Sequence, residues 1–123
     1  MKLFDGIHVV SVSVTDLVRA RIFYSETLGL GEPVLDLVDA DWIEFSTGGA
    51  EGGNLSVILA SPGWEPSTGT TVVLNVGDCH AIVDELRCRG VACGDPVTHE
   101  GRVTTASFHD PFGNRLQIRS QAG

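Results

Sequence analysis

The residue types that most often bind metals or act as nucleophiles are few in this chain, so their spacing decides what they could do. The candidates are four histidines and three cysteines: His8, His80, His99, His109, Cys79, Cys88 and Cys93. His99 and His109 have no ligand-type residue at i+2 or i+4, and the cysteines form no C-x-x-C pair. Neither group has the spacing of a zinc site, so the sequence predicts no metal.

The chain also lacks the residue sets that serve nucleophilic catalysis or phosphate binding. No Ser-His-acid or Cys-His arrangement is readable, and the glycine-rich stretch 48–53 has neither the strand-to-helix setting nor the lysine of a P-loop. The carboxylate of Glu44 has two possible environments. Ile43 and Phe45 should face the core, so Trp42 and Glu44 should face the other way. A solvated Glu44 is the default, and an acid in the wall of a site is the alternative.

A tight turn near the end of the sequence positions the most polar predicted strand. The segment Asp110-Pro111-Phe112-Gly113-Asn114 combines a fixed proline φ, a glycine free to take positive φ, and two residues that bond local backbone. It therefore predicts a hairpin. Beyond the turn, side chains should alternate between two faces. The apolar face carries Leu116 and Ile118, and the polar face carries Arg115, Gln117 and Arg119.

A strand followed by a helix occurs twice, in the same order. The stretch 7–14 alternates as a half-buried strand does, and Thr15 or Asp16 can cap a helix that ends near Gly29. The stretch 70–76 repeats the strand, and Asp78 caps a second helix that ends near Gly90. Asp16 thus corresponds to Asp78, and the chain consists of two related halves.

Three short strands are predicted after each helix. They cover 34–38, 42–47 and 55–60 in the first half, and 92–98, 102–109 and 115–119 in the second. The segment 61–67, with two prolines, links the halves because proline continues neither a helix nor a strand ladder. The predicted pattern is βαβββ, twice.

This pattern and three phrases carry a family resemblance. The phrases are Val14-Thr15-Asp16-Leu17, then Phe23-Tyr24 with Leu28-Gly29-Leu30, and the closing D-P-x-G-N turn. From His8 to Ile118 the chain resembles the vicinal oxygen chelate superfamily of glyoxalases, bleomycin-resistance proteins and extradiol dioxygenases. The resemblance implies an α+β fold of two tandem βαβββ modules that form a curved mixed sheet, a half-barrel with a concave cleft. We expect one domain over 1–123, with modules at about 5–61 and 69–120 and a linker at about 62–68.

Metal-dependent members of this superfamily use a His, Glu, His, Glu set on the concave face. The corresponding positions here are Val9, Ile58, Thr71 and Gln117, which are poor ligands for a divalent metal. His8 is one residue from the first position, and a shift of one residue turns a strand side chain to the opposite face. We therefore expect His8 to point away from the cleft, unless a bulge intervenes, and no metal or other cofactor to be bound.

Alternation along all strands predicts the residues that line the cleft and bind a ligand. They are Val9, Ser11, Ser13, Ile58, Thr71, Val73, Asn75, Gln117 and Arg119, with Trp42 and Glu44 as additions. An apolar floor with neutral polar groups suits a partly apolar small molecule held in one orientation by hydrogen bonds.

Composition limits the partners. The 123 residues, 42% of them hydrophobic, fit one globular domain, and a net charge of −8 opposes nucleic-acid binding. No run of about 20 apolar residues could span a membrane. The odd cysteine count and the lack of an apolar leader at the start favour a cytoplasmic protein with reduced thiols.

Two functions remain open. The first is a non-catalytic protein that sequesters an antibiotic or natural product, as the binding branch of the resembled family does. The second is an enzyme, either a metal-dependent lyase or dioxygenase with ligands in another register, or a metal-free isomerase with Glu44 or a histidine as base. A homodimer is expected because a four-stranded sheet leaves exposed edges. Module pairing within one chain and pairing across two chains both remain open.

Overall fold

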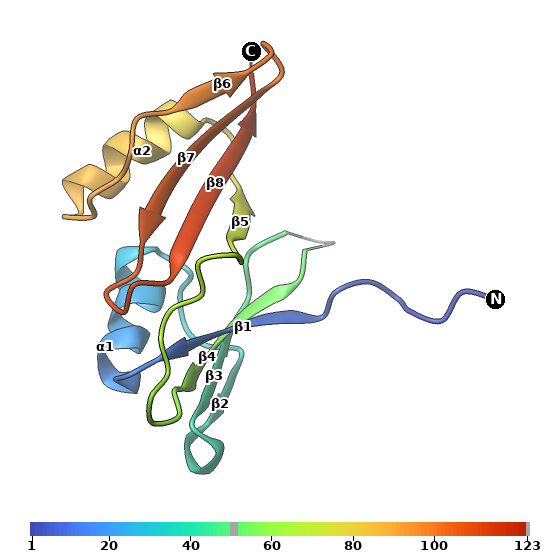
Figure 1. Ribbon diagram of the computed structural model, residues 1–123, viewed down its shortest axis with the longest axis vertical. Helices are drawn as coiled ribbons and strands as arrows, with labels where there is room; N and C mark the ends of the chain where they lie inside the picture. Colours follow the sequence, from blue (N-terminus) through green and yellow to red (C-terminus); the bar gives the residue numbers. More distant parts are fainter. Residues whose placement is uncertain (50–51, 123) are drawn as a thin grey trace. The chain divides into compact units, whose positions relative to one another are not determined.

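The computed structural model describes residues 1–49 and 52–122 and divides the chain into two compact units, Met1–Trp64 and Glu65–Gly123 (Figure 1). The boundary lies inside the predicted linker. Each unit contains one four-stranded mixed sheet and one principal helix, so the α+β class and the tandem βαβββ modules are confirmed. None of the helices in the described ranges is long and apolar enough to cross a membrane.

The first unit runs through seven elements. They are β1 (Val9–Val14), α1 (Leu17–Ile22), a π-helix η1 (Phe23–Thr27), β2 (Leu35–Leu37), a 3-10 turn η2 (Val38–Ala40), β3 (Trp42–Phe45) and β4 (Asn54–Leu59). The sheet order is β1-β4-β3-β2. β1 and β4 are parallel, and the other pairs are antiparallel.

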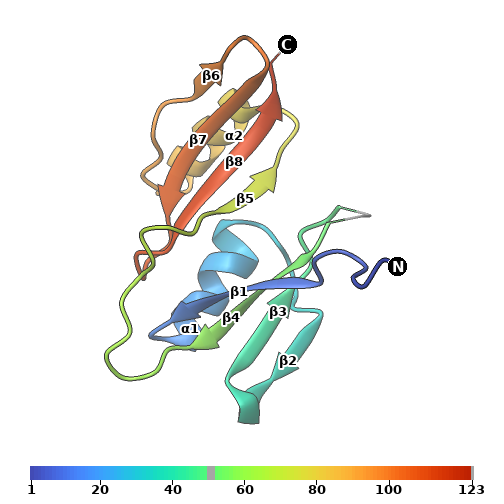
Figure 2. The same cartoon turned by 45° about the vertical axis from the view of Figure 1, so that its right-hand side comes forward.

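The second unit repeats this order. Its elements are β5 (Val72–Asn75), α2 (Cys79–Cys88), β6 (Val97–His99), β7 (Val103–His109) and β8 (Arg115–Gln121). The sheet order is β5-β8-β7-β6, with β5 parallel to β8. Figure 2 shows α2 lying across one face of β7 and β8.

The predicted caps begin both helices. The Asp16 carboxylate accepts a hydrogen bond from the Arg19 amide at 3.1 Å, and the Asp78 carboxylate accepts one from the Ala81 amide at 3.3 Å. Such bonds satisfy backbone donors that have no partner inside the helix. Gly90 follows the second helix at φ 86°, in the left-handed region that glycine adopts without strain.

The first helix is not uniform, which differs from the prediction of one helix up to Gly29. After Ile22 the backbone widens into the π-helix η1, where the Leu28 amide donates to the Phe23 carbonyl at 2.8 Å. The wider turn accompanies the burial of two consecutive aromatic residues, Phe23 and Tyr24, whose rings meet edge to face at 5.2 Å. Sequence periodicity alone cannot detect such an insertion.

Each core lies between a helix and one face of its sheet. In the first unit the Tyr24 ring stacks near Phe45 at 6.2 Å, with Val14 and Val57 fully buried. In the second unit Val83 and Leu86 of α2 are buried with Phe108, Leu116 and Ile118. Burial alternates along β7 and β8, as the period of two requires.

The predicted strand 92–98 is largely wrong. Only Val97–His99 forms a strand, preceded by an isolated bridge between Cys93 and Phe108. The Cys93 carbonyl accepts a hydrogen bond from Arg87 Nη2 at 2.7 Å. Pro96 has no amide hydrogen to donate to a neighbouring strand. The backbone between them therefore makes no continuous ladder. Strands predicted at 34–38 and 70–76 are shorter at their ends.

Candidate functional site

The strand register gives each sheet a face opposite the one that packs in the core. In the first unit Ser11 pairs with Ser56 and Ser56 with Glu44, while Trp42 pairs with Ile58. Paired residues share a face, so this surface can be defined from the register. We call it the first open face: Val9, Ser11, Ser13, Leu35, Leu37, Trp42, Glu44, Asn54, Ser56 and Ile58.

Glu44 is the central polar group of the first open face and is only 5% exposed. Its carboxylate accepts hydrogen bonds from Asn54 Nδ2 at 2.7 Å and from Trp42 Nε1 at 3.3 Å. Beside it, the Ser11 and Ser56 hydroxyls bond each other at 2.6 Å. The default expectation of a solvated Glu44 is therefore wrong, because the Asn54 side chain of β4 and the Trp42 indole enclose the carboxylate.

His8 also differs from expectation. Its Nε2 lies 3.8 Å from Glu44 Oε2, although the side chain is 85% exposed. The prediction that His8 turns away from this surface is wrong for the tip of its imidazole. Strand β1 begins at Val9, so alternation does not fix the direction of the residue before it.

The second unit has an open face of different chemistry. Gln117 pairs with Val73 and Ser107, and Arg119 pairs with Asn75 and Thr105. With the pairings of β6, the register defines the second open face: Val73, Asn75, Val97, His99, Val103, Thr105, Ser107, His109, Arg115, Gln117, Arg119 and Gln121. Thr71 lies just before β5 and contacts this face through Arg115.

Hydrogen bonds fix part of the second open face. Arg115 donates to Thr71 Oγ1 at 2.9 Å and to Ser107 Oγ at 3.1 Å, and Gln117 Nε2 donates to the same Ser107 oxygen at 3.3 Å. A hydroxyl that accepts twice keeps its own hydrogen free to donate. The Ser107 hydroxyl is therefore available as a donor on this face.

The register places ten of the eleven predicted ligand-binding residues on one or other open face, and Thr71 lies just before β5, outside the register. Whether these residues bind a ligand stays a prediction. The polar residues of the open faces that the prediction does not include are Asn54, Ser56, His99, Thr105, Ser107, His109, Arg115 and Gln121. The signal was present, because Ser56 and Asn54 precede Ile58 by two and four residues and Arg115 precedes Gln117 by two.

The donor chemistry does not fit the divalent metal that the resembled family uses. The four family positions hold two aliphatic side chains, Val9 and Ile58, and two neutral polar ones, Thr71 and Gln117. Within residues 1–49 and 52–122, no group of three His, Cys, Asp or Glu side chains is arranged to hold an ion. No step of the chemistry is therefore assigned to a metal.

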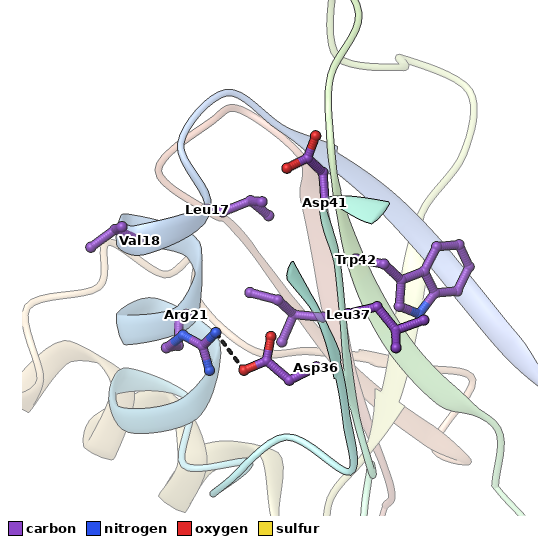
Figure 3. Close-up of a pocket in the computed structure, with 8 residues that line it drawn as sticks. Leu17, Val18, Arg21, Asp36, Leu37, Asp41 and Trp42 are labelled. Atoms are coloured by element: carbon purple, nitrogen blue, oxygen red, sulfur yellow. Dashed lines mark hydrogen bonds and ion pairs between the residues drawn. The ribbon is translucent and has the colours of Figure 1, made fainter. Parts of the chain in front are cut away.

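A pocket of about 190 Å³ lies between α1 and the β2–β3 edge of the first sheet, and Leu37 and Trp42 of the first open face are among its lining residues (Figure 3). Leu17, Val18 and Ile43 supply apolar lining, and the Arg21 and Asp36 side chains form an ion pair at 2.6 Å. That pair neutralises its own charges, and Asp41 adds a carboxylate, so the pocket offers room for an apolar group beside one acidic group. Figure 3 shows the Trp42 ring turned away from Leu17, as its place on the first open face requires.

Comparison with known proteins agrees with this geometry. The family model described as Glyoxalase/Bleomycin resistance protein/Dioxygenase superfamily matches residues 6–118, and the chain belongs to that superfamily. No match was found among curated proteins.

Three solved structures illustrate the relationship. TnmS3, an antibiotic binding protein from Streptomyces sp. CB03234, has a TM-score of 0.82 at 26% identity, covering 98% of this chain and 99% of that one. A glyoxalase/bleomycin resistance protein from the same strain has a TM-score of 0.74 at 28% identity, and the match covers 92% of this chain and 98% of that one. A superfamily member from Sphaerobacter thermophilus DSM 20745 has a TM-score of 0.79 at 25% identity, and the match covers 95% of this chain and 98% of that one.

Proposed function

We propose that this protein binds a small organic molecule of the antibiotic or natural-product type without a metal ion, and sequesters it. The observation that carries the proposal is the first open face. It combines a buried, hydrogen-bonded carboxylate with apolar side chains at the positions where metal-dependent relatives carry ligands. Such a surface can hold a partly apolar molecule and fix its orientation.

Glu44 supplies the orienting group. A carboxylate has about four acceptor positions, and the Asn54 and Trp42 donors use two of them. The remaining positions can accept N–H or O–H groups of a ligand, while Trp42, half-buried beside Glu44, offers a ring for stacking. Val9 and Ile58 complete an apolar floor.

The comparisons support the same class of function. TnmS3 is described as an antibiotic binding protein, and its fold covers nearly all of this chain at 26% identity. The chemical identity of the ligand is not carried over from that protein.

A ligand screen with a matched pair of variants tests the proposal. Chelator-treated protein is screened by thermal shift against aromatic natural products, since a ligand that binds only the native state raises its stability. Trp42→Ala should lower the affinity for the best ligand by about tenfold, as expected for losing one stacked aromatic contact. Trp64→Ala, a half-buried tryptophan outside both open faces, is the control. Equal weakening by both variants, or no ligand in the screen, would reject the proposal.

A metal-free isomerase is the second candidate, and one observation favours it. Glu44 is a buried carboxylate with an imidazole nitrogen 3.8 Å from one oxygen, so it could take a proton from carbon and return it. Incubating a bound ligand in D₂O tests this reaction. Deuterium incorporation that Glu44→Gln abolishes would establish catalysis, and a ligand recovered without deuterium would leave sequestration as the function.

We also propose that the protein is a homodimer and is cytoplasmic. Edge strand β2 exposes Leu35 and Leu37 at 41% and 46%. Apolar edges of this kind are usually covered by a partner. Light scattering should give twice the chain mass of 13.1 kDa. A mass that stays at the single-chain value across the accessible concentrations would reject the dimer.

A further inference from the structure

Five of the seven arginines of this acidic chain fall into two groups. The chain has 16 acidic and 8 basic residues, so carboxylates outnumber cations. Arg21, Arg87 and Arg89 each form an ion pair, at 2.6, 2.9 and 3.0 Å. Arg115 and Arg119 of β8 form none with any described carboxylate, even though partners are abundant in the sequence.

The second open face explains why these two arginines are unpaired. None of its twelve residues is Asp or Glu, whereas it includes two arginines, two histidines and several hydroxyl and amide groups. Its strand β8 lies between two neighbours in the sheet rather than at an edge. Positive charge is therefore gathered on one surface of a protein whose net charge is −8.

Arg119 is the most informative residue of this face. The residue is half-buried, yet its guanidinium makes no hydrogen bond or ion pair within the part of the chain that the structure describes. Its register neighbours on either side are Asn75 and Thr105. Neighbouring strands lie about 4.8 Å apart, so Asn75 and Thr105 add a polar amide and a hydroxyl beside Arg119 on the same face.

Arg115 is held differently, four residues along the same strand. At about 3.3 Å per residue its Cα lies about 13 Å from that of Arg119. The Thr71 and Ser107 hydroxyls fix its guanidinium by neutral hydrogen bonds that leave its charge uncompensated. It therefore adds to the positive field around Arg119 without occupying the same position.

We propose that the second open face binds the oxyanion group of a small organic acid, a carboxylate or a phosphate, with Arg119 as the ion-pair partner. The planar guanidinium binds either group through two parallel N–H donors. This inference rests on the proposed small-molecule binding function and names the ligand group that the second unit recognises. Nucleic-acid phosphates are a poor match, since the net charge of the protein repels the polyanion.

The test uses simple probes and the full chain. Amide and arginine side-chain NMR signals are followed during titration with benzoate, phenyl phosphate and benzamide, the last being the neutral counterpart of benzoate. Benzoate should bind at least about tenfold more tightly than benzamide, the factor expected for one charge-assisted hydrogen-bonded pair. The ratio of benzoate to phenyl phosphate affinity decides between carboxylate and phosphate.

Three substitutions complete the design, two of which remove one positive charge each. Arg119→Gln should remove the preference for benzoate, and Arg119→Lys, which keeps the charge but loses the planar fork, should retain part of it. Arg102→Gln makes the same charge change at an exposed residue before β7 and should leave the affinity within about twofold, because exposed charges are screened by salt. Far-UV spectra confirm that each variant is folded.

The outcomes separate this inference from the proposed function. Equal affinity for benzoate and benzamide, or equal loss in Arg102→Gln and Arg119→Gln, would overturn the oxyanion site. If natural products still bound and depended on Trp42, the proposed function would stand without it. If benzoate bound through Arg119 while no natural product bound, the oxyanion site would stand and the proposed function would fail.

Discussion

The two open faces come from the same strand and helix order but differ in charge. On the first, the central polar group is a buried carboxylate, Glu44, among apolar side chains and small hydroxyls. On the second, two arginines lie among amides and hydroxyls with no carboxylate on the face. The repeated module therefore fixes which positions are presented, and the residue at each position sets the chemistry.

The units also differ in how their last hairpins are closed. In the second, Asp110 accepts hydrogen bonds from the Phe112 and Asn114 amides at 2.9 and 2.8 Å and from Asn114 Nδ2 at 2.8 Å, with Gly113 at φ 90°. The predicted turn is confirmed. In the first, β3 and β4 are joined by a longer glycine-rich connection, 46–53, of which residues 50 and 51 lie outside the described part.

The largest expected effect is on this turn. Asp110 is 4% exposed and accepts at least three hydrogen bonds, so Asp110→Ala should lower the free energy of unfolding by about 3 kcal/mol. The comparable change in the first unit is Ser46→Ala, which removes one exposed bond to the Gly48 amide and should cost about 0.5 kcal/mol or less. Urea denaturation measures both. Equal losses would mean that the two connections constrain their hairpins alike.

The next largest expected effect is a loss of stability when the Glu44 carboxylate of the first open face is replaced. Glu44→Gln replaces two acceptor oxygens by one oxygen and one NH₂ group. Either the Trp42 or the Asn54 donor then faces another donor, which should destabilise the fold by about 1–2 kcal/mol.

The exposed Glu32 provides the control for that experiment. Glu32→Gln should change the denaturation midpoint little, because surface substitutions away from specific contacts stay within about 0.5 kcal/mol. A Glu44→Gln protein as stable as the natural one would show that the carboxylate is not held as described, and the contrast between the two faces would weaken.

The smallest expected effect is on thiol reactivity in the second unit. Burial raises the pKa of the Cys93 thiol, and the neighbouring Arg87 guanidinium partly offsets this by lowering it. Because a higher pKa leaves less thiolate at pH 8, Cys93 should react with iodoacetamide more slowly than the exposed Cys88. Arg87→Ala should slow Cys93 further.

The same alkylation experiment separates the second open face from the rest of its unit. Benzoate bound to the second open face should leave the Cys93 rate unchanged. Protection of Cys93 by benzoate would contradict binding of benzoate to the second open face. A faster reaction of Cys93 in Arg87→Ala would contradict the proposed effect of Arg87 on the thiol pKa.

Much of this architecture could be predicted because it depends on local rules. Asp16 and Asp78 precede their helices at capping positions, and the period of two assigned the polar face of β8 correctly. The D-P-x-G-N turn needs only its own residues. Each of these features is decided within a few neighbouring positions.

The features that sequence reasoning missed depend on contacts between distant residues. Glu44 is buried because strand β4 lies beside it: Ser56 is its partner in the β3–β4 register, and Asn54, ten positions later, donates to its carboxylate. The stretch before β6 is irregular because the Arg87 side chain of α2 donates a hydrogen bond to the Cys93 carbonyl. No periodicity in the sequence reports either contact. The unpaired state of Arg119 likewise depends on what the neighbouring strands present.

Binding by a protein freed of metal is the central claim, and one calorimetric measurement tests it. The best ligand from the screen is titrated into chelator-treated protein, alone and with one equivalent of Zn²⁺, Ni²⁺, Fe²⁺ or Mn²⁺. Since Val9, Ile58, Thr71 and Gln117 offer no metal site, we predict the same affinity, within about twofold, in every titration and recovery of unchanged ligand. Binding that required one metal per chain and was lost in His8→Ala would contradict the account.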